Sequence, residues 1–318
     1  MDAEALKTLG GALQSELSRV IVGKPDSVRD AVVTLFCGGH LLVEDVPGVG
    51  KTTLAKALAR ALGGEFRRVQ FTPDLLPSDV TGGSILNRTT NQFEFQPGPV
   101  FANVVLVDEV NRATPKTQSA LLEAMEERQV TVDGVTRPLP DPFMVIATQN
   151  NIEMTGTYPL PEAQLDRFLA RVSLGYPDRN SETAILTDQQ TTHPLLTVSA
   201  RATLAEISAA QAAVRKIFVH DSVKEYVVDV VRATRDNAQL ALGSSPRGSL
   251  YLMLAGQARA ALEGSAFVTP DHIKSVAPLV LGHRVIVRAE ARARGATGPS
   301  IIQQIMGTVA TPTAFRPS

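Results

Sequence analysis

The stretch Gly48-Val49-Gly50-Lys51-Thr52, directly after the apolar run Leu41-Leu42-Val43, limits the possible folds of this chain more than any other feature. A short buried strand, a glycine-rich turn and Lys-Thr at the start of a helix are typical of a phosphate-binding loop. The glycine backbone can curl around a phosphate chain, Lys51 can reach the outer phosphates, and Thr52 can offer a hydroxyl to Mg²⁺. A plain strand-to-helix turn is the structural alternative for this stretch alone.

A second apolar run, Val104-Val105-Leu106-Val107, ends in the two carboxylates Asp108 and Glu109. Asp108 is placed to hold the Mg²⁺ shell, whereas Glu109 points to the other face of the strand and can polarise a water for attack on the γ-phosphate. An apolar strand with this ending is common as plain structure, but the two motifs in this order are specific. Together they indicate an ATPase that uses ATP and Mg²⁺.

The loop departs from the general pattern at one position. The pattern has glycine five residues before Gly50, where this chain has Asp45, preceded by Glu44. Carboxylates facing the phosphates would repel them, so we expect both to lie on the outside of the loop. Pro47 is expected to stiffen the first turn of the loop because its φ is fixed. The predicted nucleotide contacts of the loop are the consecutive residues Pro47, Gly48, Val49, Gly50, Lys51, Thr52 and Thr53.

Composition restricts the location and the partners of the protein. The chain has 318 residues, enough for one large domain and a satellite, and its 31 basic and 32 acidic residues nearly cancel. This balance argues against a general attraction to nucleic acid or to anionic membranes. The single cysteine, Cys37, excludes a disulfide within the chain, and the chain has neither a signal peptide nor a run of 18 apolar residues. These features predict a cytoplasmic protein without membrane insertion.

The first part of the chain alternates strand and helix signals, which predicts an α/β fold with a parallel five-stranded sheet and helices on both faces. The predicted strands are Leu41–Val43, Arg68–Phe71, Val104–Val107, Phe143–Ala147 and Ala170–Leu174. From about Ser199 an alanine-rich helical periodicity predicts an all-α second domain. The predicted domains are residues 1–178 and 195–318. The connection between them, with a helix at 181–190, is a predicted hinge about which the second domain moves as a lid.

Two further segments do not belong to a minimal core of sheet and helices. Residues 81–99 are rich in Gly, Asn, Thr and Pro and contain Phe93 and Phe95. They are interpreted either as a surface excursion anchored to the core by its phenylalanines or as a moving element coupled to the nucleotide state. Residues 130–136 form two strand edges around Asp133-Gly134, which predicts a β-hairpin.

Several longer segments carry a family resemblance. They are Val22-Gly23, the phosphate loop, residues 74–82, 95–100, 108–127, 147–150 and 156–168, and Ser245-Pro246-Arg247. On these segments the chain resembles the MoxR family of AAA+ ATPases, although the match thins after residue 180. The family usually has a proline after the asparagine of the fourth motif, where this chain has Asn151. The resemblance implies an AAA+ nucleotide-binding P-loop core at 1–178, a helical lid at 195–318, and nucleotide contacts from Val22 and Gly23.

The resemblance also implies roles for four polar residues. Arg167 stands where the family places the arginine finger, which reaches the nucleotide of the neighbouring subunit. Arg247 resembles the lid arginine that contacts the γ-phosphate within the same subunit. Asn150 resembles the polar sensor that orients the attacking water, and Arg112 is a candidate second arginine at the interface.

A finger that acts between subunits implies a ring, a hexamer by resemblance. ATP turnover would tilt the lid against the sheet domain, and the insertions at 81–99 and 131–137 would transmit the movement. The favoured function is a MoxR-type remodelling ATPase. It would help a client protein mature, assemble or receive a metal cofactor, often together with a von Willebrand A-domain protein.

Two alternatives belong to other functional classes. The first is a nucleic-acid motor, but the only basic concentration is the run Arg284–Arg294, which is expected to be an exposed helix face, and no basic stripe with interleaved aromatic residues occurs in the insertions. The second is a scaffold that binds ATP without hydrolysing it. The presence of Glu109 and Arg167 argues against a scaffold, which could dispense with both.

Overall fold

A central sheet of five parallel strands, in the order β2-β5-β8-β1-β9, organises the N-terminal half of the chain in the computed structural model. The structure describes residues 1–149, 157–190 and 193–314. The strands are β1 (Leu41–Glu44), β2 (Phe66–Gln70), β5 (Val104–Asp108), β8 (Met144–Gln149) and β9 (Ala170–Val172). Each begins and ends within two residues of a predicted strand. The α/β class predicted from the sequence is confirmed.

Alternate residues of the central strands face two separate apolar clusters. Leu41 and Val43 of β1 belong to one cluster, and Leu42 between them belongs to the other, as the two-residue period of a strand requires. The first cluster includes side chains of α1 (Ala3–Ser18), α2 (Pro25–Phe36) and α3 (Lys51–Ala61). The second includes side chains of α4 (Pro77–Thr81) and α5 (Pro115–Glu127). Helices therefore cover both faces of the sheet.

The C-terminal region is mainly helical, and we call its part from α9 onward the lid. Its helices are α9 (Asp221–Arg235), α10 (Pro246–Glu263), α11 (Pro270–Leu281), α12 (Ala289–Ala293) and α13 (Gly298–Thr308). The expectation of an all-α second domain is wrong in one detail, since β10 (Leu240–Leu242) pairs antiparallel with β11 (Ile286–Val287). β-Branched residues in β11 favour this short ribbon.

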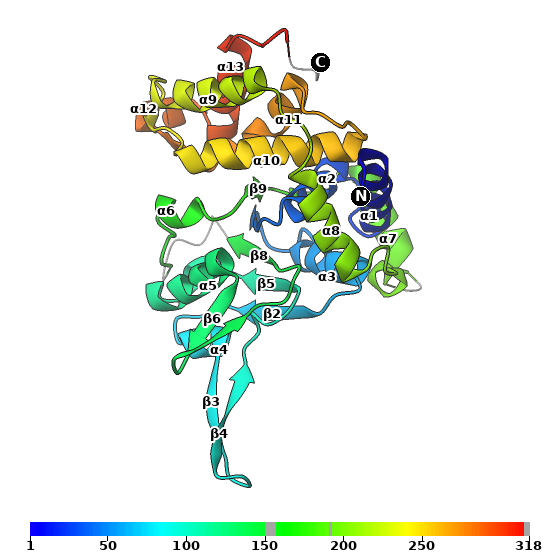
Figure 1. The fold of residues 1–318 in the computed structure, drawn as a ribbon, viewed down its shortest axis with the longest axis vertical. Coiled ribbons are helices and arrows are strands. Elements are labelled where there is room, and N and C mark those ends of the chain that lie inside the picture. Colours follow the sequence, from blue (N-terminus) through cyan, green and yellow to red (C-terminus); the bar gives the residue numbers. More distant parts are fainter. Residues whose placement is uncertain (150–156, 191–192, 315–318) are drawn as a thin grey trace.

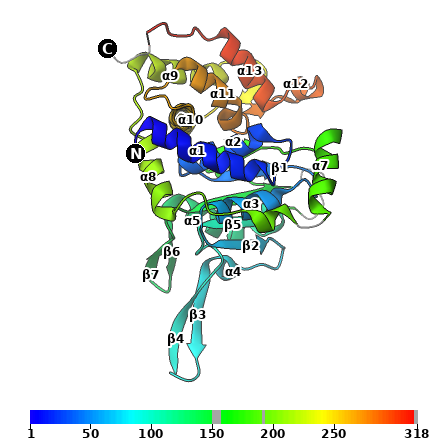
Figure 2. The same cartoon turned by 90° about the vertical axis from the view of Figure 1, so that its right-hand side faces the viewer.

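Helix α10 lies across α1 and α2, so the lid sits beside the sheet domain rather than apart from it (Figures 1 and 2). One apolar cluster continues from the sheet face through α1 and α2 into the lid. Helix α8 (Leu204–Val214) also packs against α2. Helix α7 (Arg179–Gln189), capped by the Asp178 side chain, forms the predicted helical part of the connection. No helix of the described residues is long and apolar enough to cross a membrane.

Both inserted segments form β-hairpins. Strands β3 (Gly82–Asn87) and β4 (Gln92–Pro97) extend away from the body, at the end opposite the lid (Figures 1 and 2). Strands β6 (Gln129–Val132) and β7 (Val135–Pro138) turn at Asp133 and Gly134, which both have positive φ. Short connections complete the chain, namely α6 (Glu162–Leu165) and the 3₁₀ turns η1 (Val110–Arg112) and η2 (Pro194–Thr197).

The phenylalanines of the β3–β4 hairpin differ in their surroundings. Phe93 is 75% exposed and does not anchor the hairpin. The Phe95 ring contacts the Phe101 ring edge-on, with centroids 5.6 Å apart, and the Arg137 guanidinium lies 3.9 Å from the Phe95 centroid. Because Phe95 belongs to β4 and Arg137 to β7, this contact packs the β3–β4 hairpin against the β6–β7 hairpin.

A buried arginine joins the lid to the sheet domain. Arg284 follows α11, and its Nε donates to Asp166 Oδ1 at 2.8 Å. Its terminal nitrogens donate to the carbonyls of Asp166, Phe168, Leu169 and Val280. The basic run predicted to be an exposed helix face therefore begins with a side chain that has no exposed area. Burial lowers the pKa of Arg284 to about 10, which leaves the guanidinium charged at neutral pH.

We expect Arg284→Ala to lower the free energy of unfolding by about 3 kcal/mol or more, because it leaves Asp166 and several carbonyls without their partner. Urea unfolding of the full chain measures this loss. The control is Arg294→Ala, since Arg294 is exposed and its loss is expected to cost less than about 0.5 kcal/mol. Equal stability of the two variants would contradict the assignment of Arg284 as the link between lid and sheet domain.

Burial also perturbs a carboxyl group on α2. It raises the pKa of Asp30 from 3.8 to about 6. The folded state then binds this proton more tightly than the unfolded state, so stability falls as the pH rises from about 4 to about 6. We expect Asp30→Asn to lose this pH dependence and to be more stable than the wild type near pH 7.5. Urea unfolding of both proteins at about pH 4.5 and 7.5 tests this. An Asp30→Asn variant less stable than the wild type at about pH 7.5 would contradict it.

Candidate active site

The phosphate loop connects β1 to α3. Gly48 has φ 85° and Gly50 has φ 96°, values in the left-handed region that a side chain would strain. Gly50 is the N-cap of α3, and no side chain caps the first N–H groups of this helix. These N–H groups can therefore donate to a bound anion. Lys51 begins the helix, and its Nζ donates to the carbonyl of Asp45 at 2.9 Å. Its ammonium group is thus folded back over the loop.

The two acidic residues before the loop point toward β9. Asp45 Oδ2 accepts from the backbone N–H groups of Leu174 and Gly175, both at 2.6 Å, and from the Ser173 hydroxyl at 3.1 Å. Glu44 forms an ion pair with a β9 residue, Arg171. The carboxylates therefore lie outside the loop, as expected, and Asp45 ties the loop to the segment that leads into α7.

A cavity of about 180 Å³ lies beside the loop. It is lined by the α1–α2 connection, the loop and the α7 region, namely Val20, Ile21, Val22, Lys24, Gly48, Val49, Gly50, Thr53, Gly175, Pro177, Ile185, Asp188, Gln189, His193 and Pro194. Gly23 is next to this wall, and its positive φ and the Ser181 hydroxyl, 2.2 Å from the place of a Cβ atom, leave room only for glycine. Pro47 is exposed at the outer turn of the loop.

The α7 side of this cavity was not anticipated from the sequence. Ile185, Asp188, Gln189 and His193 approach the loop only because Asp45 and the end of β9 direct the chain there. No local motif marks these residues. The helical signal of the connection is the one hint that the sequence contains.

Asp108 is the last residue of β5 and Glu109 follows it, and the two carboxylates have different surroundings. Asp108 is buried, accepts from the Thr148 hydroxyl at 3.2 Å and pairs with Arg68 Nε at 2.6 Å. Glu109 has φ 56°, a strained left-handed conformation for a non-glycine residue, and this turns its carboxylate out of the strand direction. Strained backbone of this kind is characteristic of functional sites.

Polar neighbours hold the Glu109 carboxylate. Gln70 Nε2 donates to Oε2 at 2.8 Å, and Arg112 Nη1 lies 2.9 Å from the same oxygen. The Thr148 hydroxyl accepts from the backbone N–H of Glu109 at 2.9 Å. Arg112, a candidate interface residue from the sequence, thus contacts Glu109 of its own subunit. Gln70 and Thr148 were not predicted, because only the β2-β5-β8 order brings them to Glu109.

The residues present fit a magnesium nucleotide. The hydroxyl of Thr52, in the first turn of α3, and the Asp108 carboxylate are hard oxygen donors of the kind that Mg²⁺ prefers. When bound, the metal neutralises charge on the β- and γ-phosphates. Lys51 and the glycine backbone would hold the phosphates, and Glu109 would orient a water. Asn150, the predicted polar sensor, lies outside the described residues.

Two arginines form a separate cluster with Glu126 near the C-terminal end of α5. Arg167, just after α6, places its Nε 2.9 Å from Glu126 Oε2. Arg247, in the first turn of α10, places Nη2 2.6 Å from Glu126 Oε1. Arg247, predicted to contact the γ-phosphate of its own subunit, lies beside Arg167 and is not among the residues that line the loop cavity, and its role stays a prediction. The helix that carries Arg247 begins at Pro246, beside Asp166, and this sets its position.

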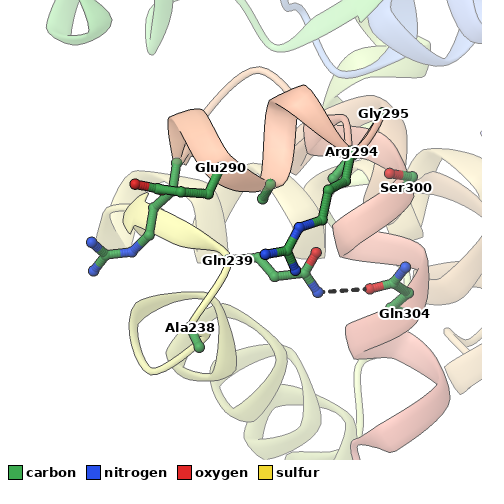
Figure 3. Close-up of a pocket in the computed structure, with 10 residues that line it drawn as sticks. Ala238, Gln239, Glu290, Arg294, Gly295, Ser300 and Gln304 are labelled. Carbon is green, nitrogen blue, oxygen red and sulfur yellow. Dashed lines mark hydrogen bonds between the residues drawn. The ribbon is translucent and has the colours of Figure 1, made fainter.

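A larger hollow of about 510 Å³ lies within the lid, between the β10–β11 ribbon, α12 and α13 (Figure 3). The Arg294 side chain reaches over Gln239 and Gln304, whose amides are joined by a 3.1 Å hydrogen bond. The hollow is lined by no residue of the phosphate loop and by neither Asp108 nor Glu109. It is therefore not the nucleotide site.

Comparison with known proteins agrees with this geometry. Residues 40–170 match the family described as "ATPase family associated with various cellular activities (AAA)", and residues 232–305 match the AAA lid domain. Chaperone MoxR1 of Mycobacterium tuberculosis is 43% identical over 93% of this chain and 81% of its own length. The chain belongs to the MoxR family of AAA+ ATPases. Protein MoxR of Methylorubrum extorquens is 30% identical over 94% of both chains.

Two further relatives match almost the whole chain. The uncharacterised protein YeaC of Bacillus subtilis is 50% identical over 97% of both chains. A crystal structure of a protein assigned as an ATPase, from Cytophaga hutchinsonii, superposes with a TM-score of 0.90, at 36% identity over 98% of this chain and 97% of the other. The MoxR resemblance, the AAA+ core followed by a helical lid, and ATP hydrolysis as the activity are thereby confirmed.

Proposed function

We propose that this MoxR-family ATPase works as a ring, a hexamer by family resemblance, in which Arg167 and Arg247 of one subunit complete the nucleotide site of the next. The pairing of the two arginines on Glu126, away from the loop cavity, carries the proposal. Within one subunit, Arg68 and Arg112 are paired with Asp108 and Glu109, and neither Arg167 nor Arg247 lines the loop cavity. Phosphoryl transfer needs positive charge on the γ-phosphate beyond Mg²⁺, and a neighbouring copy is the source that head-to-tail rings provide.

Within each site the roles divide between binding and chemistry. Lys51 and the backbone of Gly48 to Thr53 bind the phosphates, and Thr52 with Asp108 holds Mg²⁺. Val22 and Gly23 contact the nucleoside end. Glu109 polarises the attacking water and, in this proposal, Asn150 orients it. Arg167 and Arg247 of the neighbour stabilise the charge that develops on the γ-phosphate.

The output of the ring is mechanical work on another protein. Arg284 of the lid is bonded to Asp166, the residue before Arg167. A movement of Arg167 at the neighbour's nucleotide would therefore be passed to the lid of its own subunit. The β3–β4 and β6–β7 hairpins are joined by a 2.5 Å hydrogen bond from Ser84 to Asp133 and are proposed to transmit this movement. Client maturation or metal-cofactor insertion, together with a von Willebrand A-domain protein, is the proposed use. That a relative is named a chaperone supports it.

The dependence of ATP turnover on protein concentration tests the shared site. We expect the rate per subunit to fall when the protein is diluted below the dissociation constant of the assembly, in step with loss of the assembly in sedimentation velocity experiments. The monomer lacks the second half of each site and should be nearly inactive. A rate per subunit that stays constant down to the monomer would contradict a site completed by the neighbour.

A further inference from the structure

Glu126 contacts both candidate trans-acting arginines, one with each of its carboxylate oxygens. Oε2 lies 2.9 Å from Arg167 Nε, and Oε1 lies 2.6 Å from Arg247 Nη2. The three side chains come from α5, from the segment after α6 and from α10. The Glu126 carboxylate bridges the two guanidinium groups, and Ser245 at the start of α10 also donates to Asp166, next to Arg167.

The nitrogen that each arginine uses decides what the contact does. Arg167 is held through Nε, the nitrogen next to its aliphatic stem, whereas Arg247 is held through its terminal nitrogen Nη2. Asp166 Oδ2 lies 4.0 Å from Arg247 Nε, so Arg247 has a second carboxylate near it besides that of Glu126. A carboxylate bound to one nitrogen of a guanidinium fixes the plane of the group, and the other N–H groups of the fork can still donate to a phosphate.

The charge around this cluster points to an anionic ligand. The adjacent cavity, about 180 Å³, is lined by Arg128, Arg167, Arg215 and Arg247, whereas Glu126 is the only carboxylate among its lining residues. Like charges at this separation repel, and one carboxylate between two guanidinium groups reduces that repulsion. Loss of Glu126 would therefore let Arg167 and Arg247 move apart.

We propose that Glu126 is a positioning residue for catalysis at the neighbouring subunit, because its two carboxylate oxygens hold Arg167 and Arg247 as one unit. This inference rests on the proposed function, in which both arginines act on the neighbour's nucleotide. Glu126 itself does not touch the nucleotide. Its contribution is to the geometry of two groups that do, and misplacement of such groups by about 1 Å can lower a rate by about 100-fold.

The test compares Glu126→Gln with Glu127→Gln. Both remove one negative charge from the last turn of α5 and so have the same effect on the helix dipole, but Glu127 is exposed and its carboxylate does not belong to the cluster. For Glu126→Gln we expect kcat to fall between about 10-fold and 100-fold, with KM and nucleotide affinity within about twofold of the wild type. Glu127→Gln should retain wild-type kcat. Glu126→Asp, which keeps the charge, should retain more activity than Glu126→Gln.

A double variant separates positioning from a general structural effect. In an Arg167→Ala background, Glu126→Gln should lower kcat by less than about threefold, because the main group that it positions is already gone. A full additional loss in that background, or equal kcat for Glu126→Gln and Glu127→Gln, would overturn the assignment. If Arg167→Ala alone left turnover unchanged, the proposed function itself would fail. A large effect of Arg167→Ala with none of Glu126→Gln would refute only the role of Glu126.

Discussion

Replacing Arg167 with alanine is expected to lower ATP turnover by about 10³-fold or more, by analogy with other arginine fingers. The Arg167 guanidinium lies with Arg247 at Glu126 and does not line its own loop cavity. In the proposed ring, its loss would remove positive charge from the neighbour's γ-phosphate. Nucleotide affinity should stay within about twofold, because the loop, Lys51 and the Mg²⁺ ligands are intact. Steady-state ATPase assays and titration with a fluorescent nucleotide analogue measure the two quantities.

The matched control for this variant is Arg232→Ala. Arg232 is an exposed arginine in the last turn of α9 that does not line the cavity beside Glu126, and its replacement should leave turnover unchanged. An Arg167→Ala protein that hydrolyses ATP at the wild-type rate would exclude Arg167 from catalysis. Loss of nucleotide affinity in parallel with turnover would instead mean that Arg167 supports the fold of its own binding site.

Glu109→Gln and Lys51→Ala are expected to separate hydrolysis from binding. A glutamine at 109 retains a side-chain oxygen for Gln70 and Arg112 but cannot polarise a water, so turnover should fall by about 10²-fold to 10⁴-fold while ATP still binds. Lys51→Ala removes the cation that reaches the outer phosphates, so ATP binding itself should be lost. Equilibrium binding and single-turnover hydrolysis with radiolabelled ATP measure both effects.

Thermal unfolding provides the control for these two variants. Both side chains are accessible to solvent, and neither belongs to an apolar cluster, so the unfolding temperature of the ligand-free proteins should stay close to that of the wild type. Added ATP should raise it for Glu109→Gln and not for Lys51→Ala. Equal loss of binding in the two variants would contradict the role given to Glu109.

The strands and the phosphate loop could be predicted because their signals are local. Val104 to Val107 form an apolar run, and a run buried on both faces is characteristic of a central parallel strand. The Asp133-Gly134 turn predicts the β6–β7 hairpin because both positions need positive φ. The carboxyl ends of parallel strands meet at one edge, so Asp108 and the loop could be expected to lie together.

The remaining features depend on contacts between segments that lie far apart in the sequence. Arg247 pairs with Glu126, 121 residues away, and Arg284 pairs with Asp166, 118 residues away. Apart from the family resemblance at Ser245-Pro246-Arg247, no pattern within α10 or within the basic run distinguishes these two arginines from solvated ones. Likewise, Gln70 reaches Glu109 because β2 and β5 are adjacent in the sheet, an order that the alternation of strands and helices alone does not specify.

The most direct test of the shared site is the ATPase rate of an equimolar mixture of Glu109→Gln and Arg167→Ala. Each variant alone lacks one half of every site. In mixed rings, some sites join the intact Glu109 of one subunit to the intact Arg167 of its neighbour, so we predict a rate well above the sum of the two separate rates. A mixture no more active than that sum, under conditions where mixed assemblies form, would place Arg167 within its own subunit's site or outside catalysis.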